Sequence, residues 1–204
     1  MKNEIIIMGA GGQSRSLISI LIQNKFSIQG ILDETYDPLK EEIIHNTKLI
    51  GNYNDYKFNV PIVLAIGDNT KRMYLFQKFN SKILKDNLCH STSFIDPDAS
   101  IGYSNQIFGR SFINTKVFAG NNNILNTGSI LEHEVKIGSH NHISVGSILC
   151  GRVTIGDRCF IGAGAVVIDK LSICSDVTIG ANSVVIKSIS EPGVYVGNPA
   201  RKVN

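Results

Sequence analysis

Residues 137–166 read IGSHNH-ISVGSI-LCGRVT-IGDRCF-IGAGAV, five blocks of six residues that each begin with an aliphatic side chain. The same phase holds from residue 95 to residue 190, where sixteen consecutive blocks begin with Ile, Leu or Val except at Ala119. A period of six fits neither the 3.6-residue helix nor the two-residue strand as one continuous element. It is typical of a solenoid of short strands and tight turns. Three blocks make a triangular coil of eighteen residues, so the sequence predicts a parallel β-helix over residues 91–190.

Two columns of this repeat bear on how the coils stack. Gly102, Gly120 and Gly138 lie eighteen residues apart, and we expect them to reach the unusual backbone angles that corners need. A second column holds Asn105, Asn123 and Asn141. These amides either stack as a ladder or serve left-handed turns, and we favour the turns. The outer faces are flat and only moderately charged, which favours side-by-side association of three prisms.

The first ninety residues follow a different pattern. Residues 4–8 read as a buried strand, a Gly-rich turn follows, residues 16–24 have helical spacing, and residues 27–32 read as a second strand. A third strand is expected over residues 61–66, a second helix over 70–79 and a short strand over 81–84. Strand, turn, helix and strand make a parallel βαβ unit. The sequence therefore predicts a small Rossmann-like α/β domain over residues 1–90, followed by the solenoid and a tail over residues 191–204.

The Gly-rich turn is a candidate phosphate site. Gly11 and Gly12 let backbone N–H groups approach a phosphate at the start of the following helix. Asp33, about twenty residues on, stands where an acid binds a ribose hydroxyl. Ser14 replaces the last glycine of the dinucleotide fingerprint, and the domain is too short for two nucleotide-binding halves. We therefore expect one nucleotide diphosphate, as in a nucleotide-linked sugar. The alternative is a turn without ligand that only docks the domain on the solenoid.

Composition narrows the class of protein. The chain has 204 residues and a net charge of +3 without a Lys/Arg-rich run, which argues against a nucleic-acid partner. The first apolar run, residues 5–8, is too short for a signal peptide or a membrane span. The four cysteines show neither CxxC pairing nor zinc spacing, so we expect reduced packing residues in a cytoplasmic protein without a membrane partner.

The solenoid carries a cluster of histidines. His133, His140 and His142 lie within ten residues, beside two glutamates. A neutral imidazole suits general-base chemistry near pH 7, and a neighbouring carboxylate such as Glu134 can orient it. Gly151 follows His133 by eighteen residues, so it should stack on the next coil and leave space for a ligand. Solvated surface histidines or a zinc site are the alternatives.

The tail does not follow the six-residue repeat and carries two cationic residues near its end. Arg201 and Lys202 would suit the phosphates of a long anionic cofactor, or they are ordinary surface charges near a terminus.

Taken together, these residues resemble the left-handed β-helix acyltransferases with a small Rossmann-like N-terminal domain. This family includes the sialic acid O-acetyltransferases and the nucleotide-sugar 4-amino N-acetyltransferases of bacillosamine and perosamine synthesis. The matching stretches are residues 126–134 (NTGSILEHE), 142–146 (HISVG), 160–164 (FIGAG) and 197–201 (GNPAR). The resemblance implies a left-handed coil, acetyl-CoA as the donor, and a homotrimer with its sites between prisms. We expect no metal, because the spacing of the histidines differs from that of the metal-binding solenoids.

The resemblance also implies roles for individual residues. His133 matches the general base, Glu134 the acid that increases its basicity, and Gly151 a backbone donor to the acetyl oxygen. Asn126 matches a residue near the acceptor amine. The acetyl-CoA groove is matched by His142, Ala163 and Ala181. The nucleotide-sugar contacts are matched by Gly11, Gly12, Gln13, Asp33, Glu34 and Gly67. The chain departs from the family at Gly12-Gln13, where the family often has Gly-His.

The expected activity is direct acetyl transfer from acetyl-CoA to the 4-amino group of a UDP- or dTDP-linked amino-dideoxy sugar. One alternative keeps the donor and acetylates a sialic-acid-type hydroxyl. Two others belong to different classes: a metal-dependent hydratase of the gamma carbonic anhydrase type, whose ligand spacing differs, and a non-catalytic nucleotide-sugar-binding trimer.

Overall fold

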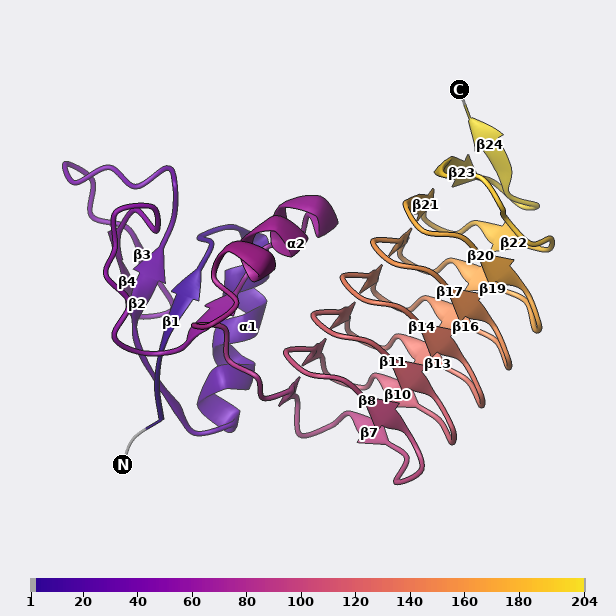
Figure 1. The fold of residues 1–204 in the computed structure, drawn as a ribbon, viewed down its shortest axis with the longest axis horizontal. Helices are drawn as coiled ribbons and strands as arrows, with labels where there is room; N and C mark the ends of the chain where they lie inside the picture. The colour runs from indigo at the N-terminus through magenta and orange to yellow at the C-terminus, as the bar shows by residue number, and fades with distance from the viewer. Residues whose placement is uncertain (1–2, 204) are drawn as a thin grey trace. The chain divides into compact units, whose positions relative to one another are not determined.

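The computed structural model describes residues 3–203. The chain divides into two compact units, with the division between residues 88 and 89 (Figure 1). The first is an α/β unit and the second a β-solenoid. Within residues 3–203, no helix combines the length and the apolar character needed to cross a bilayer.

The N-terminal unit is built on a five-stranded sheet in the order β3-β4-β2-β1-β5. Its strands are β1 (Asn3–Met8), β2 (Phe26–Leu32), β3 (Ile43–Ile44), β4 (Thr47–Gly51) and β5 (Ile62–Leu64), and its helices are α1 (Gly12–Gln23) and α2 (Asn69–Lys78). Strand β1 pairs in parallel with both β2 and β5, so the carboxyl ends of these three strands share one edge. The buried faces of the strands and of α2 form one apolar cluster that includes Ile6, Met8, Leu32 and Leu75.

Three elements of this unit differ from the sequence prediction. Helix α1 begins at Gly12, four residues early, so Gly12 is already in its first turn and Gly11 is its N-cap. The hairpin β3–β4 was not predicted, because its two-residue turn is His45-Asn46 rather than a glycine pair. Both residues nevertheless take the positive φ values, 45° and 61°, that such a turn requires. The strand expected over residues 81–84 is reduced to one bridge between Ile62 and Ile83.

The second unit is a parallel solenoid with three faces, which we call A, B and C. Face A contains β6 (Leu88–Cys89), β9 (Gln106–Ile107), β12 (Ile124–Leu125), β15 (His142–Ile143), β18 (Phe160–Ile161), β21 (Val177–Ile179), β23 (Gly193–Val196) and β24 (Arg201–Val203). Face B contains β7 (Phe94–Ile95), β10 (Phe112–Ile113), β13 (Ile130–Leu131), β16 (Ile148–Leu149), β19 (Val166–Val167) and β22 (Val184–Val185). Face C contains β8 (Ser100–Ile101), β11 (Phe118–Ala119), β14 (Lys136–Ile137), β17 (Thr154–Ile155) and β20 (Ser172–Ile173).

The chain passes from face A to B to C and back in every coil, so there are three corners, AB, BC and CA (Figure 1). The aliphatic first positions fill the interior as predicted: from Ile107 to Val185 every one is buried. Ile95 and Ile101 are only partly buried, because their strands end faces B and C and have a neighbour on one side only.

The expected role of the glycine column was wrong. Positive φ angles at corner CA belong to the fourth position of the block, as at Asn122 and His140, and not to Gly120 or Gly138 in the second position. Glycine is required there for another reason, since a Cβ on Gly120 would lie 2.7 Å from the carbonyl oxygen of Gly138. Successive coils approach so closely at this corner that no side chain fits.

The asparagine column forms the ladder that we had not favoured. The Oδ1 atom of Asn105 accepts the backbone N–H of Asn123 at 2.8 Å, and Asn123 Oδ1 accepts that of Asn141 at 2.8 Å. The Nδ2 atom of Asn123 donates to the Gly138 carbonyl at 3.0 Å. These fully buried amides therefore bond one coil to the next inside the prism.

The residues after the repeat extend face A. Strand β23 pairs in parallel with β21, and β24 returns antiparallel to β23.

Candidate functional site

His133 stands at corner BC, directly after β13. Its Nδ1 atom lies 3.2 Å from Oε2 of Glu134, and the two side chains are 43% and 48% exposed. Glu134 takes a left-handed φ of 62°, which is the fourth-position turn that this corner repeats at Lys116, Arg152 and Lys170. A carboxylate only accepts hydrogen bonds, so the contact places the proton on Nδ1 and leaves the Nε2 lone pair available as a base.

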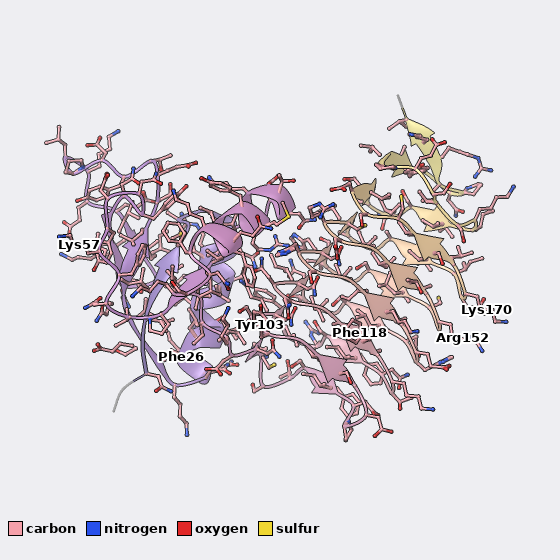
Figure 2. The ribbon with its side chains drawn as sticks, viewed as in Figure 1. Phe26, Lys57, Tyr103, Phe118, Arg152 and Lys170 are labelled. Atoms are coloured by element: carbon pink, nitrogen blue, oxygen red, sulfur yellow. The ribbon has the colours of Figure 1, made fainter. Side chains whose placement is uncertain are left out.

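Gly151 lies under the imidazole of His133, one coil further along. A Cβ built on Gly151 would be 2.5 Å from both Cε1 and Nε2 of that ring, and the glycine is buried. The backbone N–H of the next residue, Arg152, donates to the His133 carbonyl at 2.9 Å, which fixes the two coils to each other. The eighteen-residue spacing thus predicted this stacking correctly. Arg152 and Lys170 project from the same corner on successive coils (Figure 2).

A second glutamate at corner BC had no predicted role. Glu132 Oε2 accepts a hydrogen bond at 2.8 Å from Nδ2 of Asn114, one coil before it. Asn114 Oδ1 in turn accepts the Thr115 N–H at 2.7 Å, which fixes the orientation of the amide. The same spacing of eighteen would have identified this pair from the sequence.

Asn126 and His142 meet near corner AB. Asn126 Oδ1 accepts the backbone N–H of Thr127 at 2.8 Å, so its Nδ2 is the atom that lies 3.2 Å from His142 Nε2. An amide N–H is a donor, hence Nε2 of His142 acts as the acceptor. The imidazole is 8% exposed and packs edge-on against the ring of Phe160 at 5.1 Å between centroids.

The remaining residues matched to acetyl-CoA lie towards the C-terminal coils. Ala163 and Ala181 occupy the same position of corner AB on successive coils and are both exposed. Arg201 and Lys202 lie on β24 beside a cavity of about 330 Å³, and Lys202 Nζ pairs with Glu191 Oε2 at 3.1 Å.

One chain does not bring all these residues together. His133, Glu134 and Gly151 lie at corner BC, whereas Asn126, His142, Ala163 and Ala181 lie at or next to corner AB. Face B separates the two groups. The expected cluster of three histidines is also wrong, because His140 lies at corner CA, where its Nδ1 contacts Asn122 Nδ2 at 2.8 Å. Residues that are close in the sequence lie at different corners because the chain changes direction at every corner. Among residues 3–203, no three His, Cys, Asp or Glu side chains converge in the manner of metal ligands.

The Gly-rich turn of the N-terminal unit follows β1. Gly9 must be glycine, because its φ is 111° and a Cβ would lie 2.6 Å from the Ala65 carbonyl oxygen. Gly11 precedes α1 as its N-cap, and added Cβ atoms on Gly11 or Gly12 would meet nothing within 4 Å. Gln13 follows in the first turn of the helix. The turn therefore opens at the carboxyl edge of the sheet, as an anion site at a helix start requires.

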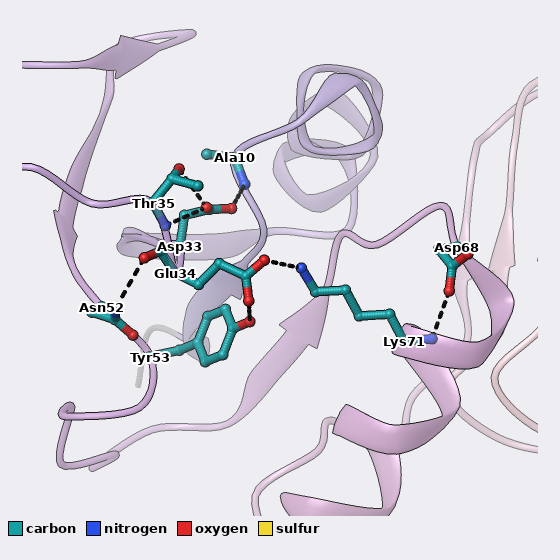
Figure 3. A network of polar contacts seen from close by, with 8 residues as sticks. All are labelled: Ala10, Asp33, Glu34, Thr35, Asn52, Tyr53, Asp68 and Lys71. Carbon is teal, nitrogen blue, oxygen red and sulfur yellow. Dashed lines mark hydrogen bonds and ion pairs between the residues drawn. The ribbon is translucent and has the colours of Figure 1, made fainter.

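Asp33 supports this turn. Its Oδ2 accepts the N–H of Ala10 at 2.8 Å, and its Oδ1 accepts the N–H and the hydroxyl of Thr35 at 2.9 and 2.7 Å (Figure 3). Burial raises the pKa of this carboxyl, but the hydrogen bonds from Thr35 and Ala10 outweigh it, and the pKa lies below its ordinary value. Three of roughly four acceptor positions are occupied, so Asp33 mainly holds the Gly-rich turn to the end of β2.

Glu34, the next residue, belongs to a network that sequence reasoning missed. Its carboxylate accepts the hydroxyl of Tyr53 at 2.5 Å and pairs with the ammonium group of Lys71 (Figure 3). The hydrogen bond from Lys71 and then that from Tyr53 lower the pKa of Glu34. Tyr53 follows β4 and Lys71 lies in α2, so no local motif reveals the cluster.

Gly67 is held by a buried arginine. Arg72 of α2 is fully buried and donates from Nη1 to the carbonyls of Ile66 and Gly67, both at 3.1 Å, and from Nη2 to Asn69 Oδ1 at 2.8 Å. Burial lowers its pKa to about 9. Gly67 itself is exposed, at the same sheet edge as the Gly-rich turn.

Comparison with known proteins gives matches to both units. A model described as the PglD N-terminal domain matches residues 4–79, and one described as bacterial transferase hexapeptide (six repeats) matches residues 152–187. No curated protein sequence matches the chain.

Solved structures resemble the chain over nearly its whole length. PerB from Caulobacter crescentus, in complex with CoA and GDP-perosamine, is 26% identical with a TM-score of 0.90, covering 98% of this chain and 97% of PerB. The acetyltransferase domain of PglB from Neisseria gonorrhoeae, in complex with acetyl coenzyme A, is 22% identical with a TM-score of 0.88 over all of both chains, a likeness of fold. Both units therefore match transferase models, and the chain has the fold of the left-handed β-helix, hexapeptide-repeat acyltransferases with a PglD-type N-terminal domain.

Proposed function

We propose that the protein transfers the acetyl group of acetyl-CoA to the 4-amino group of a nucleotide-linked amino-dideoxy sugar, carried on UDP or dTDP. The observation that carries the proposal is the His133–Glu134 pair, whose free imidazole nitrogen lies over a residue without a side chain. Support comes also from PerB, a structural neighbour that holds CoA and GDP-perosamine.

In the proposed reaction the sugar amine attacks the carbonyl carbon of the thioester. His133 Nε2 accepts the amine proton as the new C–N bond forms, and Glu134 stabilises the imidazolium that results. Negative charge develops on the acetyl oxygen, where the N–H of Gly151 would donate to it. The C–S bond then breaks, and His133 returns the proton to the departing thiolate of CoA. An amine is itself a competent nucleophile, so no acyl-enzyme is needed.

A second copy of the chain is needed to complete this site, and face B is the surface that would receive it. The outward side chains of its six strands are all apolar and lie in register: Phe94, Phe112, Ile130, Ile148, Val166 and Val184. Phe94 and Phe112 are 47% and 36% exposed and stack on each other at 5.0 Å. The outward column of face C is polar apart from Phe118. A continuous apolar stripe of this length is typical of an interface.

The proposed assembly is a homotrimer with face B of each prism towards the three-fold axis. A ring of three such faces brings corner BC of one subunit beside corner AB of the next. His133 and Gly151 of one chain would then face Asn126, Ala163 and Ala181 of its neighbour. This arrangement joins the two groups of residues that a single chain keeps apart.

The activity is tested by incubating the protein with acetyl-CoA and UDP-, dTDP- or GDP-linked 4-amino sugars, and separately with sialic acid. Mass spectrometry should show one added acetyl group on the amine of a nucleotide sugar. His133→Ala should lower kcat by about 10²–10⁴-fold. Unchanged turnover in this variant would remove His133 from the mechanism. Acetylation of the sialic acid hydroxyl alone would assign the acceptor to the other branch of the family, and binding of nucleotide sugar without any acetyl transfer would favour a sensor.

A further inference from the structure

The ion pair between Glu34 and Lys71 spans the edge of the sheet where the ligand is expected. Glu34 follows β2, whereas Lys71 lies in the first turn of α2, which follows β5. Strand β1 lies between β2 and β5 in the sheet. The Lys71 side chain therefore passes the carboxyl end of β1, the strand that leads into the Gly-rich turn (Figure 3).

This position is the crevice in which open α/β sheets bind their ligands. The chain leaves β1 towards β2 on one side and reaches β5 on the other, so the switch in strand order falls beside β1. A diphosphate at the start of α1 would meet the backbone of Gly11 and Gly12 on one side. Lys71 is a cation within reach of the same edge, from the side of β5.

The Lys71 ammonium group can exchange Glu34 for another anion at little cost. The side chains of Lys71 and Glu34 are 39% and 47% exposed, and ion pairs this accessible to water contribute little to the stability of a protein. The backbone of Lys71 is held independently, since its N–H donates to Asp68 Oδ1 at 2.7 Å and caps the helix. Glu34 would keep the Tyr53 hydroxyl at 2.5 Å if the ammonium group left. The Lys71 ammonium group can therefore move away while the hydrogen bonds to Asp68 and Tyr53 remain in place.

We propose that Lys71 binds the diphosphate of the nucleotide sugar, and that Glu34 holds its ammonium group while the site is empty. On binding, Nζ exchanges an oxygen of Glu34 for an oxygen of the diphosphate, which carries two negative charges where the carboxylate carries one. The freed Glu34 oxygen becomes an acceptor for a hydroxyl or N–H of the nucleoside. This inference rests on the proposed nucleotide-sugar site and adds a residue to it that no motif identifies.

The simplest alternative is that Lys71 only holds Glu34 in place. The two roles predict different effects of Glu34→Gln on a ligand that has phosphates but no nucleoside. If Glu34 competes for Lys71, removing its charge strengthens binding of inorganic pyrophosphate. If Lys71 serves only to position Glu34, pyrophosphate binding is indifferent to both residues.

The test is calorimetric titration of the full-length protein with inorganic pyrophosphate and then with UDP and dTDP. Lys71→Met should weaken pyrophosphate binding about tenfold, the usual effect of losing one charge-assisted hydrogen bond, whereas Lys71→Arg should largely retain it. Glu34→Gln should strengthen it several-fold. Lys78→Met, at the far end of the same helix, is the matched control and should bind as the parent does. Thermal melts verify that every variant is folded.

The proposal is overturned if Lys71→Met binds pyrophosphate as the parent does, if Glu34→Gln weakens binding or leaves it unchanged, or if the parent protein binds no pyrophosphate. The proposed function is judged separately: nucleoside diphosphate binding and acetyl transfer that survive in Lys71→Met would sink the role of Lys71 and leave the activity intact.

Discussion

Adding one methyl group at Gly151 is the sharpest local perturbation of the proposed site. The Cβ of Gly151→Ala would lie 2.5 Å from Nε2 and Cε1 of His133, whereas carbon atoms in contact are separated by about 3.5 Å. The imidazole must therefore move by close to 1 Å. The φ of Gly151 lies outside the left-handed region, so alanine adds no backbone strain. The half-exposed ring can turn outward, and the solenoid should retain its stability to within about 1 kcal/mol.

A displacement of 1 Å between a base and its substrate can lower the rate about 10²-fold, equivalent to about 2.7 kcal/mol in the activation free energy. We expect Gly151→Ala to lower kcat by that factor, with little change in the midpoint of thermal unfolding. Steady-state kinetics of CoA release and differential scanning calorimetry measure the two quantities.

The control is a double-mutant cycle. If Gly151→Ala acts by displacing His133, it should have almost no further effect in a His133→Ala background. Full activity in Gly151→Ala would refute the stacked geometry as a requirement for catalysis. Equal losses in both backgrounds would show that the methyl group acts on something other than the imidazole.

Three further outcomes are expected. Ile148→Lys, in the middle of the face B stripe, should dissociate the proposed trimer and abolish transfer, because a buried unpaired charge costs about 3–5 kcal/mol. Thr154→Lys, on face C of the same coil, should remain trimeric by light scattering. Asn123→Ala should lower the free energy of unfolding by about 2–4 kcal/mol in denaturant titrations, because it removes two interior hydrogen bonds between coils. Asp33 has a lowered pKa, so its ionised form stabilises the fold above about pH 4 and loses that contribution as the pH falls through the folded-state pKa. Asp33→Asn should therefore be about 1–2 kcal/mol less stable than the parent at pH 7, and the difference should shrink as the pH falls below the ordinary pKa of an aspartate.

The solenoid was predictable because each coil repeats the same local environment. The aliphatic column defined the interior, and a spacing of eighteen placed Gly151 against His133 before any coordinates were known. The roles of Gly120 and Asn123 were misjudged because both residue types favour turns, and sequence alone does not show how closely two coils approach. The fourth-position turns are instead occupied by residues such as Glu134, which carry no such signal.

For the candidate nucleotide site, the sequence predicted only the residues that lie close together along the chain. The Gly-rich turn and Asp33 follow from the order of strand, turn, helix and strand. Tyr53, Lys71 and Arg72 were missed because they reach the site from other elements, and their partners lie far away in the sequence or are backbone carbonyls. A search for local sequence motifs does not detect contacts of this kind.

The central claim is that catalysis uses His133 of one subunit and corner AB of its neighbour. Two variants that we expect to be inactive test it: His133→Ala, and Ala163→Trp, which would fill the proposed acetyl-CoA groove at the exposed corner AB. When the two are unfolded and reassembled together in equal amounts, about one quarter of the interfaces pair an intact His133 with an intact corner AB. The mixture should then recover about one quarter of the parent activity. If each site lies within a single chain, the mixture will be no more active than the two variants assayed apart.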